Sequence, residues 1–184
     1  MALTVLLGGA RSGKSELAVA LAARAAAPVS FVATGEALDQ EFSERIARHR
    51  ERRPAHWRTV EEPVALVETL GHIDPDDTVI LDCLTLWVAN LFERGASEAA
   101  IFTAAEEVSG IAAARRGLTV VVSNEVGSGI VPLAAATRAY RDALGRVNAT
   151  FATRAERALL VVAGRALHLA DPLELLAGDA PGRG

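Results

Sequence analysis

The chain has 184 residues, a length that fits one ordinary domain with a core large enough to be stable without disulfides. Hydrophobic residues make up 51% of it, yet no run of about 18 apolar residues occurs, which predicts a protein without a membrane span or a secretory leader. A net charge of -4 and an aromatic content of 4% argue against a protein that binds nucleic acid. The single cysteine, Cys83, cannot form an internal disulfide, so we expect a cytoplasmic protein.

Predicted strands and helices alternate along the first half of the chain. A strand at 3–7 precedes a glycine-rich turn and an alanine-rich helix over 14–26, and a second strand follows at 29–33. Asp39 is the expected N-cap of a polar helix that reaches Arg52, with Pro54 marking its end. A short segment at 57–60 and a helix over 63–70 then lead to a buried strand at 78–81.

The second half continues the alternation. Helices are predicted over 84–94 and 98–116, a strand at 118–122, a loop closed by Pro132, a helix over 139–156, and strands at 158–163 and 166–169. The nearly continuous apolar strands indicate an α/β fold, in which a mostly parallel β-sheet is flanked by helices on both faces. We expect residues 1–170 to form one catalytic domain and residues 171–184 to form a flexible C-terminal tail.

The turn after the first strand carries a phosphate-binding motif. Its residues match G-x-x-x-x-G-K-[ST] between a strand and a helix; they are Gly8, Gly9, Ala10, Arg11, Ser12, Gly13, Lys14 and Ser15. The backbone N–H groups of such a loop and the helix N-terminus bind phosphates. Lys14, the only lysine among 19 basic residues, is expected to reach the β- and γ-phosphates, and the Ser15 hydroxyl to bind Mg²⁺. The alternative, a turn that merely connects strand and helix, does not explain why the only lysine stands there.

Asp82 comes directly after the apolar strand at 78–81. A carboxylate at the end of a buried strand is the usual second protein partner of the metal in such nucleotide sites. The alternative is that Asp82 caps the helix that begins near Leu84, since aspartate is a favoured N-cap.

Positive charge is concentrated in residues 45–58, which hold six arginines and two histidines. On a helix, Arg45 and His49 share a face with Arg52 or Arg53, an arrangement suited to a phosphate chain. The alternative is a solvated helix with ordinary ion pairs, Glu41 with Arg45 and Glu44 with Arg48, which leaves four of the arginines unexplained. Neighbouring arginines lower the pKa of an imidazole and so favour its neutral, nucleophilic form, as nucleotidyl transfer requires.

Several segments together resemble one known family. They are GGARSGKS at 8–15, RIARHRERRPAHWRTVEEP at 45–63, LDCLT at 81–85, VSNEVGSGIVP at 122–132 and GRVN at 145–148. With them the chain resembles, over about residues 3–169, the bifunctional adenosylcobinamide kinase / adenosylcobinamide-phosphate guanylyltransferase family of cobalamin biosynthesis. The resemblance implies a RecA-like P-loop NTPase fold and a homotrimer. It also implies two reactions: phosphorylation of adenosylcobinamide by GTP or ATP, then transfer of GMP from GTP to adenosylcobinamide phosphate, with release of pyrophosphate.

The resemblance also assigns roles to residues. His49 is the implied nucleophile that carries GMP, whereas His56 is expected to be structural beside Trp57. The implied nucleotide contacts, besides the loop at 8–15, are Ala33, Thr34, Gly35, Arg50, Glu51, Arg52, Arg53, Glu61 and Asp82. Glu125 is expected to face the corrinoid or a neighbouring subunit.

Two other functions fit parts of the sequence. A simple P-loop kinase would use the arginines to stabilise phosphate and would leave His49 without a chemical role. A nucleotide-dependent module that grips nucleic acid would use the same arginines, but the acidic charge balance argues against it.

Overall fold

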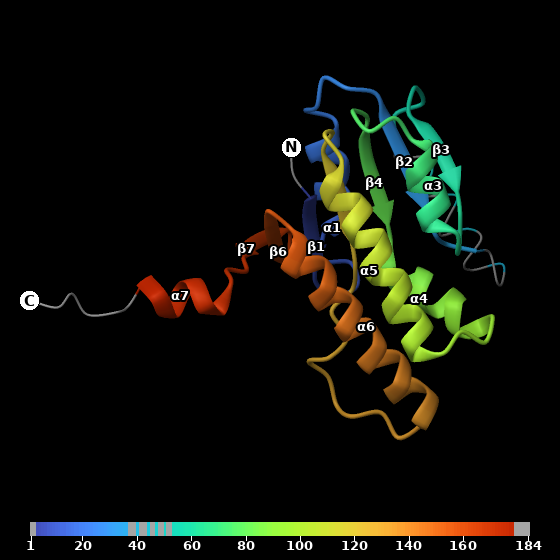
Figure 1. Ribbon diagram of the computed structural model, residues 1–184, viewed down its shortest axis with the longest axis vertical. Coiled ribbons are helices and arrows are strands. Elements are labelled where there is room, and N and C mark those ends of the chain that lie inside the picture. Colours follow the sequence, from blue (N-terminus) through green and yellow to red (C-terminus); the bar gives the residue numbers. More distant parts are fainter. Residues whose placement is uncertain are drawn as a thin grey trace, which may run out of the picture.

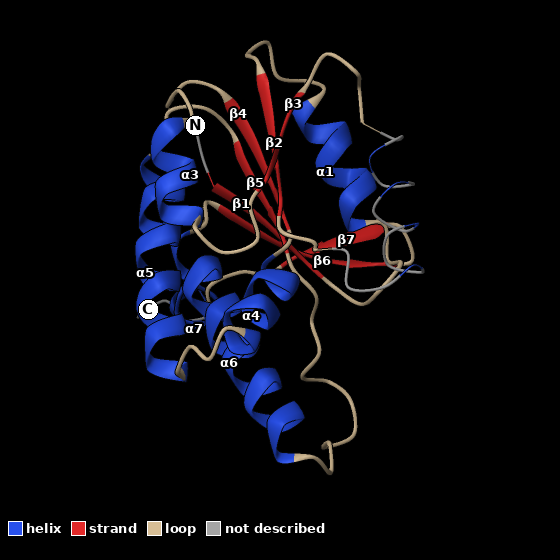
Figure 2. Cartoon of the chain, turned by 90° about the vertical axis from the view of Figure 1, so that its right-hand side faces the viewer, coloured by secondary structure: helices blue, strands red, loops and turns tan. Residues whose placement is uncertain are grey.

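One sheet of seven strands runs through the protein (Figures 1 and 2). The computed structural model describes residues 3–36 and 53–178, together with positions 40, 44, 47 and 50. The strands are β1 (Leu3–Leu7), β2 (Val29–Ala33), β3 (Arg58–Glu61), β4 (Thr78–Asp82), β5 (Thr119–Val122), β6 (Arg157–Val162) and β7 (Arg165–His168). The helices are α1 (Lys14–Ala22), α3 (Leu66–His72), α4 (Leu84–Glu93), α5 (Glu98–Ala114), α6 (Ala135–Arg154) and α7 (Pro172–Gly178).

The strand order is β3-β2-β4-β5-β1-β6-β7, and every neighbouring pair is parallel except β6 and β7. The mostly parallel sheet is therefore confirmed. Parallel strands place their carboxyl ends on one edge, so the residues after β1, β2, β4 and β5 gather there. All four of these strands are buried along their length, apart from the half-buried Asp82.

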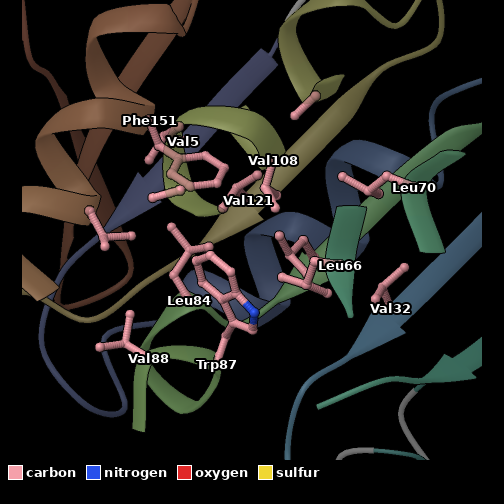
Figure 3. Packing of buried hydrophobic residues seen from close by; sticks show 14 of the residues in the cluster. Val5, Val32, Leu66, Leu70, Leu84, Trp87, Val88, Val108, Val121 and Phe151 are labelled. Atoms are coloured by element: carbon pink, nitrogen blue, oxygen red, sulfur yellow. The ribbon is translucent and has the colours of Figure 1, made fainter. Parts of the chain in front are cut away.

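Helices cover both faces of the sheet, as predicted (Figure 2). Helices α3 to α6 bury one face, in a core that includes Leu84, Trp87 and Phe151 (Figure 3). Helix α1 lies on the other face, where Ala18 and Ala22 pack against Phe31, Ile80 and Val120. Each fully buried large apolar side chain contributes roughly 1.5–3 kcal/mol, so the larger core carries most of the hydrophobic stabilisation.

A buried arginine at the end of α5 holds the end of α3 and the connection from α3 to β4. Arg115, at the end of α5, is only 6% exposed and donates hydrogen bonds to four carbonyl oxygens, those of Leu70, Ile73, Asp74 and Asp77. These carbonyls come from the end of α3 and from the connection to β4. Arg115 thereby satisfies backbone groups that the helix end leaves without intrahelical partners.

Most predicted elements are present, with different ends. The segment at 57–60 is an edge strand, β3, which is polar and exposed and therefore lacks an apolar run. Helix α6 begins at Ala135 and not at 139, because alanines at 134–136 favour the helix. Positions 40, 44, 47 and 50 of the predicted polar helix are helical.

Beyond Asp171 the sequence suggested only a tail, whereas Pro172–Gly178 forms α7. A proline at the first helical position and Glu174 in the first turn favour a helix start there. In the described part of the chain, none of the helices combines the length and the apolar character that a membrane span requires.

Candidate active site

The phosphate-binding loop leaves the sheet at the end of β1 and leads into α1. Gly8 has φ of 147°, and a Cβ there would lie 2.2 Å from the carbonyl oxygen of Val161 in β6, so the loop can start only with glycine. Gly13 has φ of 102° and is the N-cap of α1, where no side chain caps the helix. The first N–H groups of α1 therefore have neither an intrahelical acceptor nor a capping side chain, as a phosphate site requires.

Within this loop the tip and the flanks differ in exposure. Gly9, Ala10 and Arg11 are exposed, whereas Gly8, Ser12 and Lys14 are buried. Arg11 has φ of 57°, a left-handed conformation that non-glycine residues seldom adopt. Ser15 is half-buried in the first turn of α1, next to Lys14.

Lys14 is bound by its own loop. Its Nζ donates to the carbonyl oxygens of Gly8 at 2.9 Å and Gly9 at 2.7 Å, and to the Ser12 hydroxyl at 3.3 Å. Burial lowers the pKa of Lys14, while the charges of Cys83, Asp82 and Glu16 act in the opposite direction. The ammonium thus occupies a site of oxygen acceptors beside the carboxyl end of β4, where phosphate oxygens could replace the carbonyls.

Asp82 ends β4, and Thr34 fixes the backbone on either side of it. The Thr34 N–H donates to the Asp82 carbonyl at 3.1 Å. The Thr34 hydroxyl donates to the Cys83 carbonyl at 2.7 Å and accepts from the Cys83 N–H at 2.8 Å. Thr34 is fully buried, so its hydroxyl holds the Asp82 segment, and the half-buried Gly35 is the more accessible of the two residues for a nucleotide.

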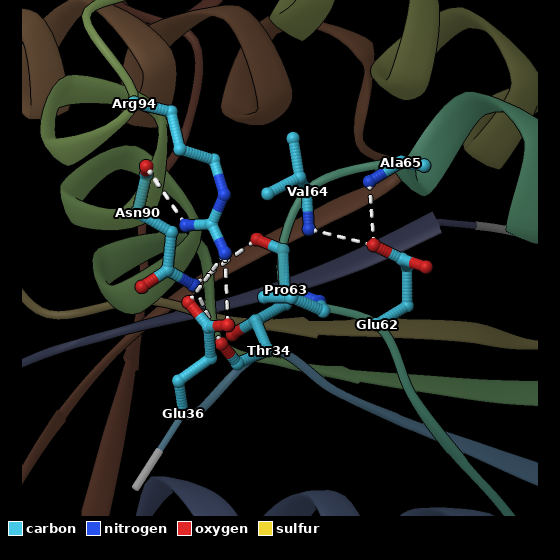
Figure 4. A network of polar contacts seen from close by, with 8 residues as sticks. All are labelled: Thr34, Glu36, Glu62, Pro63, Val64, Ala65, Asn90 and Arg94. Atoms are coloured by element: carbon cyan, nitrogen blue, oxygen red, sulfur yellow. Dashed lines mark hydrogen bonds and ion pairs between the residues drawn. The ribbon is translucent and has the colours of Figure 1, made fainter. Parts of the chain in front are cut away.

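A polar network ties the ends of β2 and β3 to α4 (Figure 4). Asn90 donates to the carbonyl oxygens of Thr34 at 2.7 Å and Pro63 at 3.0 Å. Arg94 binds both carboxylate oxygens of Glu36 at 2.8 Å. Since Asn90 is buried and contacts both strand ends, it sets the spacing of the segments that carry Thr34 and Glu61.

Two arginines from residues 45–58 contact the sheet, Arg50 at β3 and Arg53 at β2. Arg50 forms an ion pair with Glu61 at the end of β3, which brings together two residues that the sequence assigned to the nucleotide site. The Arg53 guanidinium lies 3.7 Å from the centre of the Phe31 ring, and its buried Nε has no hydrogen-bond partner among the described residues. Burial lowers the pKa of Arg53, the Asp82 charge raises it, and Arg50 lowers it further.

These contacts connect the predicted site residues into one group. Asp82 interacts electrostatically with both Lys14 and Arg53, and Arg53 in turn with Arg50. Asp82 therefore lies electrostatically between Lys14 and Arg53, and Glu61 pairs with Arg50 at the outer strand β3. His49, Glu51 and Arg52 lie outside the described residues. His56 is exposed, and its ring makes an edge contact with Trp57 at 6.4 Å between centroids.

A magnesium ion would find few protein ligands here. Among the described residues, no group of three or more His, Cys, Asp or Glu side chains could hold a metal. Nucleotide-bound Mg²⁺ needs only one or two protein oxygens, because phosphates and water complete its shell. The Ser15 hydroxyl and the Asp82 carboxylate have the oxygen chemistry that Mg²⁺ prefers, so the residues fit this ion.

Sequence reasoning gave no structural role to three polar residues that connect the elements around the site and that have no assigned nucleotide contact: Thr85, Asn90 and Tyr140. The Thr85 hydroxyl accepts from the Asn124 N–H at 2.8 Å, and the Tyr140 hydroxyl donates to the Thr85 carbonyl at 3.0 Å. Asn90 stands inside a helix whose other members are mainly apolar. That isolated amide was the available signal for Asn90, Thr85 was marked only as the last residue of LDCLT at 81–85, and nothing in the sequence marked Tyr140.

Comparison with known proteins adds to this geometry. A family model described as cobinamide kinase / cobinamide phosphate guanyltransferase matches residues 4–169. The bifunctional adenosylcobalamin biosynthesis protein CobP of Pseudomonas aeruginosa is 44% identical over 178 residues, which cover 92% of this chain and 98% of the relative. The bifunctional adenosylcobalamin biosynthesis protein CobU of Escherichia coli is 43% identical over 175 residues, which cover 87% of this chain and 95% of the relative.

A solved structure supports the fold independently of these sequences. A prototypical ATPase from the type III secretion system of pathogenic bacteria superimposes with a TM-score of 0.56 at 10% identity, covering 98% of this chain. The chain spans 55% of that ATPase chain. At this identity the likeness concerns the fold alone, and it confirms the predicted P-loop NTPase fold.

Proposed function

The chain belongs to the cobinamide kinase / cobinamide phosphate guanyltransferase family, and from this premise we propose how its residues divide the two reactions. The enzyme is a transferase of cobalamin biosynthesis that acts as a kinase on adenosylcobinamide and as a guanylyltransferase on adenosylcobinamide phosphate. Family membership favours this bifunctional reading over a simple P-loop kinase. The observation that supports this assignment of residues to the two reactions is that Lys14, Asp82, Arg53 and Arg50 interact with one another in one continuous group.

In the kinase reaction, the loop at 8–15 binds the triphosphate. Lys14 exchanges the Gly8 and Gly9 carbonyls for β- and γ-phosphate oxygens, where its charge stabilises the γ-phosphoryl group as it leaves. The substrate hydroxyl attacks the γ-phosphorus and releases its proton to solvent, the bond from the γ-phosphorus to the β,γ-bridging oxygen breaks, and the nucleoside diphosphate departs. Ser15 and Asp82 would hold Mg²⁺, which supplies charge neutralisation between the phosphates.

In the guanylyltransferase reaction, His49 is the proposed nucleophile. A neutral ring nitrogen attacks the α-phosphorus of GTP, the bond to the β-bridging oxygen breaks, and pyrophosphate leaves. The phosphate oxygen of adenosylcobinamide phosphate then attacks the same phosphorus and releases the histidine. Support comes from Arg50, the residue directly after His49 in the sequence, which pairs with Glu61 at the edge of the site and lies near Arg53. Guanidinium groups there would stabilise both the pyrophosphate and the nucleotide.

Three broader parts of the proposal concern organisation. We assign both reactions to residues 1–170 and a cytoplasmic location to the enzyme. A homotrimer is proposed because the family resemblance implies one, and it is supported by apolar side chains that remain exposed, including Ile130, Leu133 and Leu167. Equilibrium sedimentation of the full chain tests this last point, and a monomer at micromolar concentration would contradict it.

The decisive experiment uses GTP labelled at the α-phosphate. The full chain is incubated with this GTP and Mg²⁺, denatured in alkali, under which a phosphohistidine-type bond persists, and analysed by mass. We expect one GMP per chain, lost on acid treatment. His56→Ala serves as the matched control and should retain the adduct, whereas His49→Ala should not form it. An adduct that persists in His49→Ala, or no adduct in the unsubstituted protein, contradicts the assignment.

A further inference from the structure

The segment that follows β5 is bound on both sides of its backbone. The N–H groups of Ser123 and Glu125 donate to β1 and its loop, at the carbonyl oxygens of Leu6 (2.9 Å) and Gly8 (3.1 Å). The residue between them, Asn124, faces the helices instead. Its N–H donates to the Thr85 hydroxyl at 2.8 Å, and its carbonyl accepts from the Asn148 side chain at 3.0 Å.

The Gly8 carbonyl is where this segment meets the phosphate loop. It accepts from the Glu125 N–H and also from the Lys14 ammonium. A carbonyl oxygen has two lone pairs, so these two donors satisfy it completely. A shift of Glu125 would therefore change the orientation of the carbonyl that holds the lysine in the absence of phosphate.

Asn148 is placed to resist such a shift. It lies on α6, is 4% exposed, and its Nδ2 reaches the Asn124 carbonyl one residue before Glu125. Its Oδ1 is buried and has no hydrogen-bond partner among the described residues. A buried acceptor without a partner destabilises a fold, so the amide is not the side chain that stability alone would favour at this position.

We propose that Asn148 is a positioning residue for the phosphate loop: by holding the Asn124 peptide against Thr85, it fixes Glu125 on Gly8 and thereby the backbone conformation of the loop that receives the nucleotide phosphates. Helix α6 thus takes part in nucleotide binding without touching the nucleotide. This inference rests on the proposed nucleotide role of the loop at 8–15.

Helix α6 also provides a matched control. Tyr140 lies on the same helix and donates a hydrogen bond to the Thr85 backbone carbonyl, not to the segment after β5. Tyr140→Phe removes one buried hydrogen bond between α6 and α4 but leaves the contacts of Asn124 intact. Asn148→Leu removes one hydrogen bond of similar length with little change in side-chain volume.

The test is the affinity for β,γ-imido-GTP, measured by calorimetry on the full chain with Mg²⁺. We expect Asn148→Leu to bind this analogue roughly tenfold more weakly than the unsubstituted protein, and Tyr140→Phe to bind it within about twofold. The KM for GTP should rise in Asn148→Leu by a similar factor, with a smaller change in kcat. A purely structural role would lower the thermal midpoint in both variants and leave both affinities unchanged.

Each result decides the proposal. Equal affinity in Asn148→Leu and the unsubstituted protein overturns it, as does equal weakening in Tyr140→Phe and Asn148→Leu. If the unsubstituted protein binds no analogue, the proposed nucleotide site itself fails and the inference with it. Should Asn148→Leu not fold, Thr85→Val replaces it, because this variant removes the acceptor for the Asn124 N–H and should weaken binding in the same way.

Discussion

The Lys14 ammonium and the Gly8 carbonyl oxygen lie 2.9 Å apart, so the lysine is already bound by its own loop before a phosphate arrives. Nucleotide binding must break this contact and the one to Gly9. The contribution of Lys14 to phosphate affinity is therefore the difference between its interaction free energy with the phosphate oxygens and that with the loop carbonyls. Of these two sets of acceptors, only the phosphates are fully charged.

Replacement of Lys14 should weaken GTP binding without unfolding the protein. Lys14→Met removes the charged donor, and we expect affinity for GTP to fall about 10- to 100-fold. Arg24→Ala, an exposed change in the same helical region, controls for loss of one positive charge. Calorimetric titration measures both, and equal affinities of the two variants would contradict the role given to Lys14.

Thr34→Val should destabilise the protein more than Thr34→Ser does. Valine keeps the shape of threonine but leaves the N–H and carbonyl of Cys83 without their partner, at a cost of about 2–4 kcal/mol for two buried groups. Serine keeps the hydroxyl and loses one methyl group, a loss of about 1 kcal/mol. Urea unfolding gives both free energies; a serine variant as unstable as the valine variant would show that packing, and not the hydroxyl, matters here.

Arg115 and Arg116 are neighbours that should behave differently. Arg115→Met removes the donor that four carbonyl oxygens share, and we expect a loss of about 3–5 kcal/mol in the free energy of unfolding. Arg116 is exposed and pairs with Asp76, so Arg116→Ala should change stability little. Neither change should alter GTP affinity. Similar unfolding midpoints for the two variants would refute the role assigned to Arg115.

The Cys83 thiol should make stability depend on alkaline pH. Burial raises its pKa from the ordinary value of 9.0 to about 11, and Asp82 adds to the shift. Because the folded state holds this proton more tightly, the contribution is fully present below pH 9.0 and is lost as pH rises through about 11. The loss amounts to about 2–3 kcal/mol.

Cys83→Ala supplies the comparison for that effect. Urea unfolding at several pH values from neutral to about 11 should show the original protein losing stability faster than the variant. Burial, the larger cause, and the Cys83 charge together raise the pKa of Tyr140 to about 12, so only the part due to burial is common to both proteins and cancels in the difference. Parallel stability curves for the two proteins would rule out titration of Cys83 in this range.

The sequence was most informative where local chemistry alone determines structure. The bounds of β1 and β2 agree with prediction because each is a short, fully buried apolar run next to glycine or proline. The loop at 8–15 was recognisable because its backbone conformation requires Gly8 and Gly13, and its phosphate binding requires Lys14. By contrast, β3 is polar and exposed, so its pairing with β2 could be learned only from the fold.

Parts of the site depended on contacts between distant segments. Thr34 was expected beside the nucleotide, and its actual hydrogen bonds go to Cys83, 49 residues away in the chain. Asn148 was part of a motif that indicated the family, but its contact with Asn124 follows from how α6 packs. No periodicity or spacing encodes such contacts, because both partners lie on elements whose local patterns are satisfied without them.

The central place of β1 also has a consequence for the order of events during synthesis. β1 is synthesised well before its neighbours β5 and β6, which begin at Thr119 and Arg157. Gly8 lies against Val161 in β6, so the phosphate loop has its final surroundings only after β6 has been synthesised. GTP therefore cannot assist the nascent chain as a folding ligand. It can stabilise only chains in which β6 is in place, because β1 pairs with strands that are distant in the sequence.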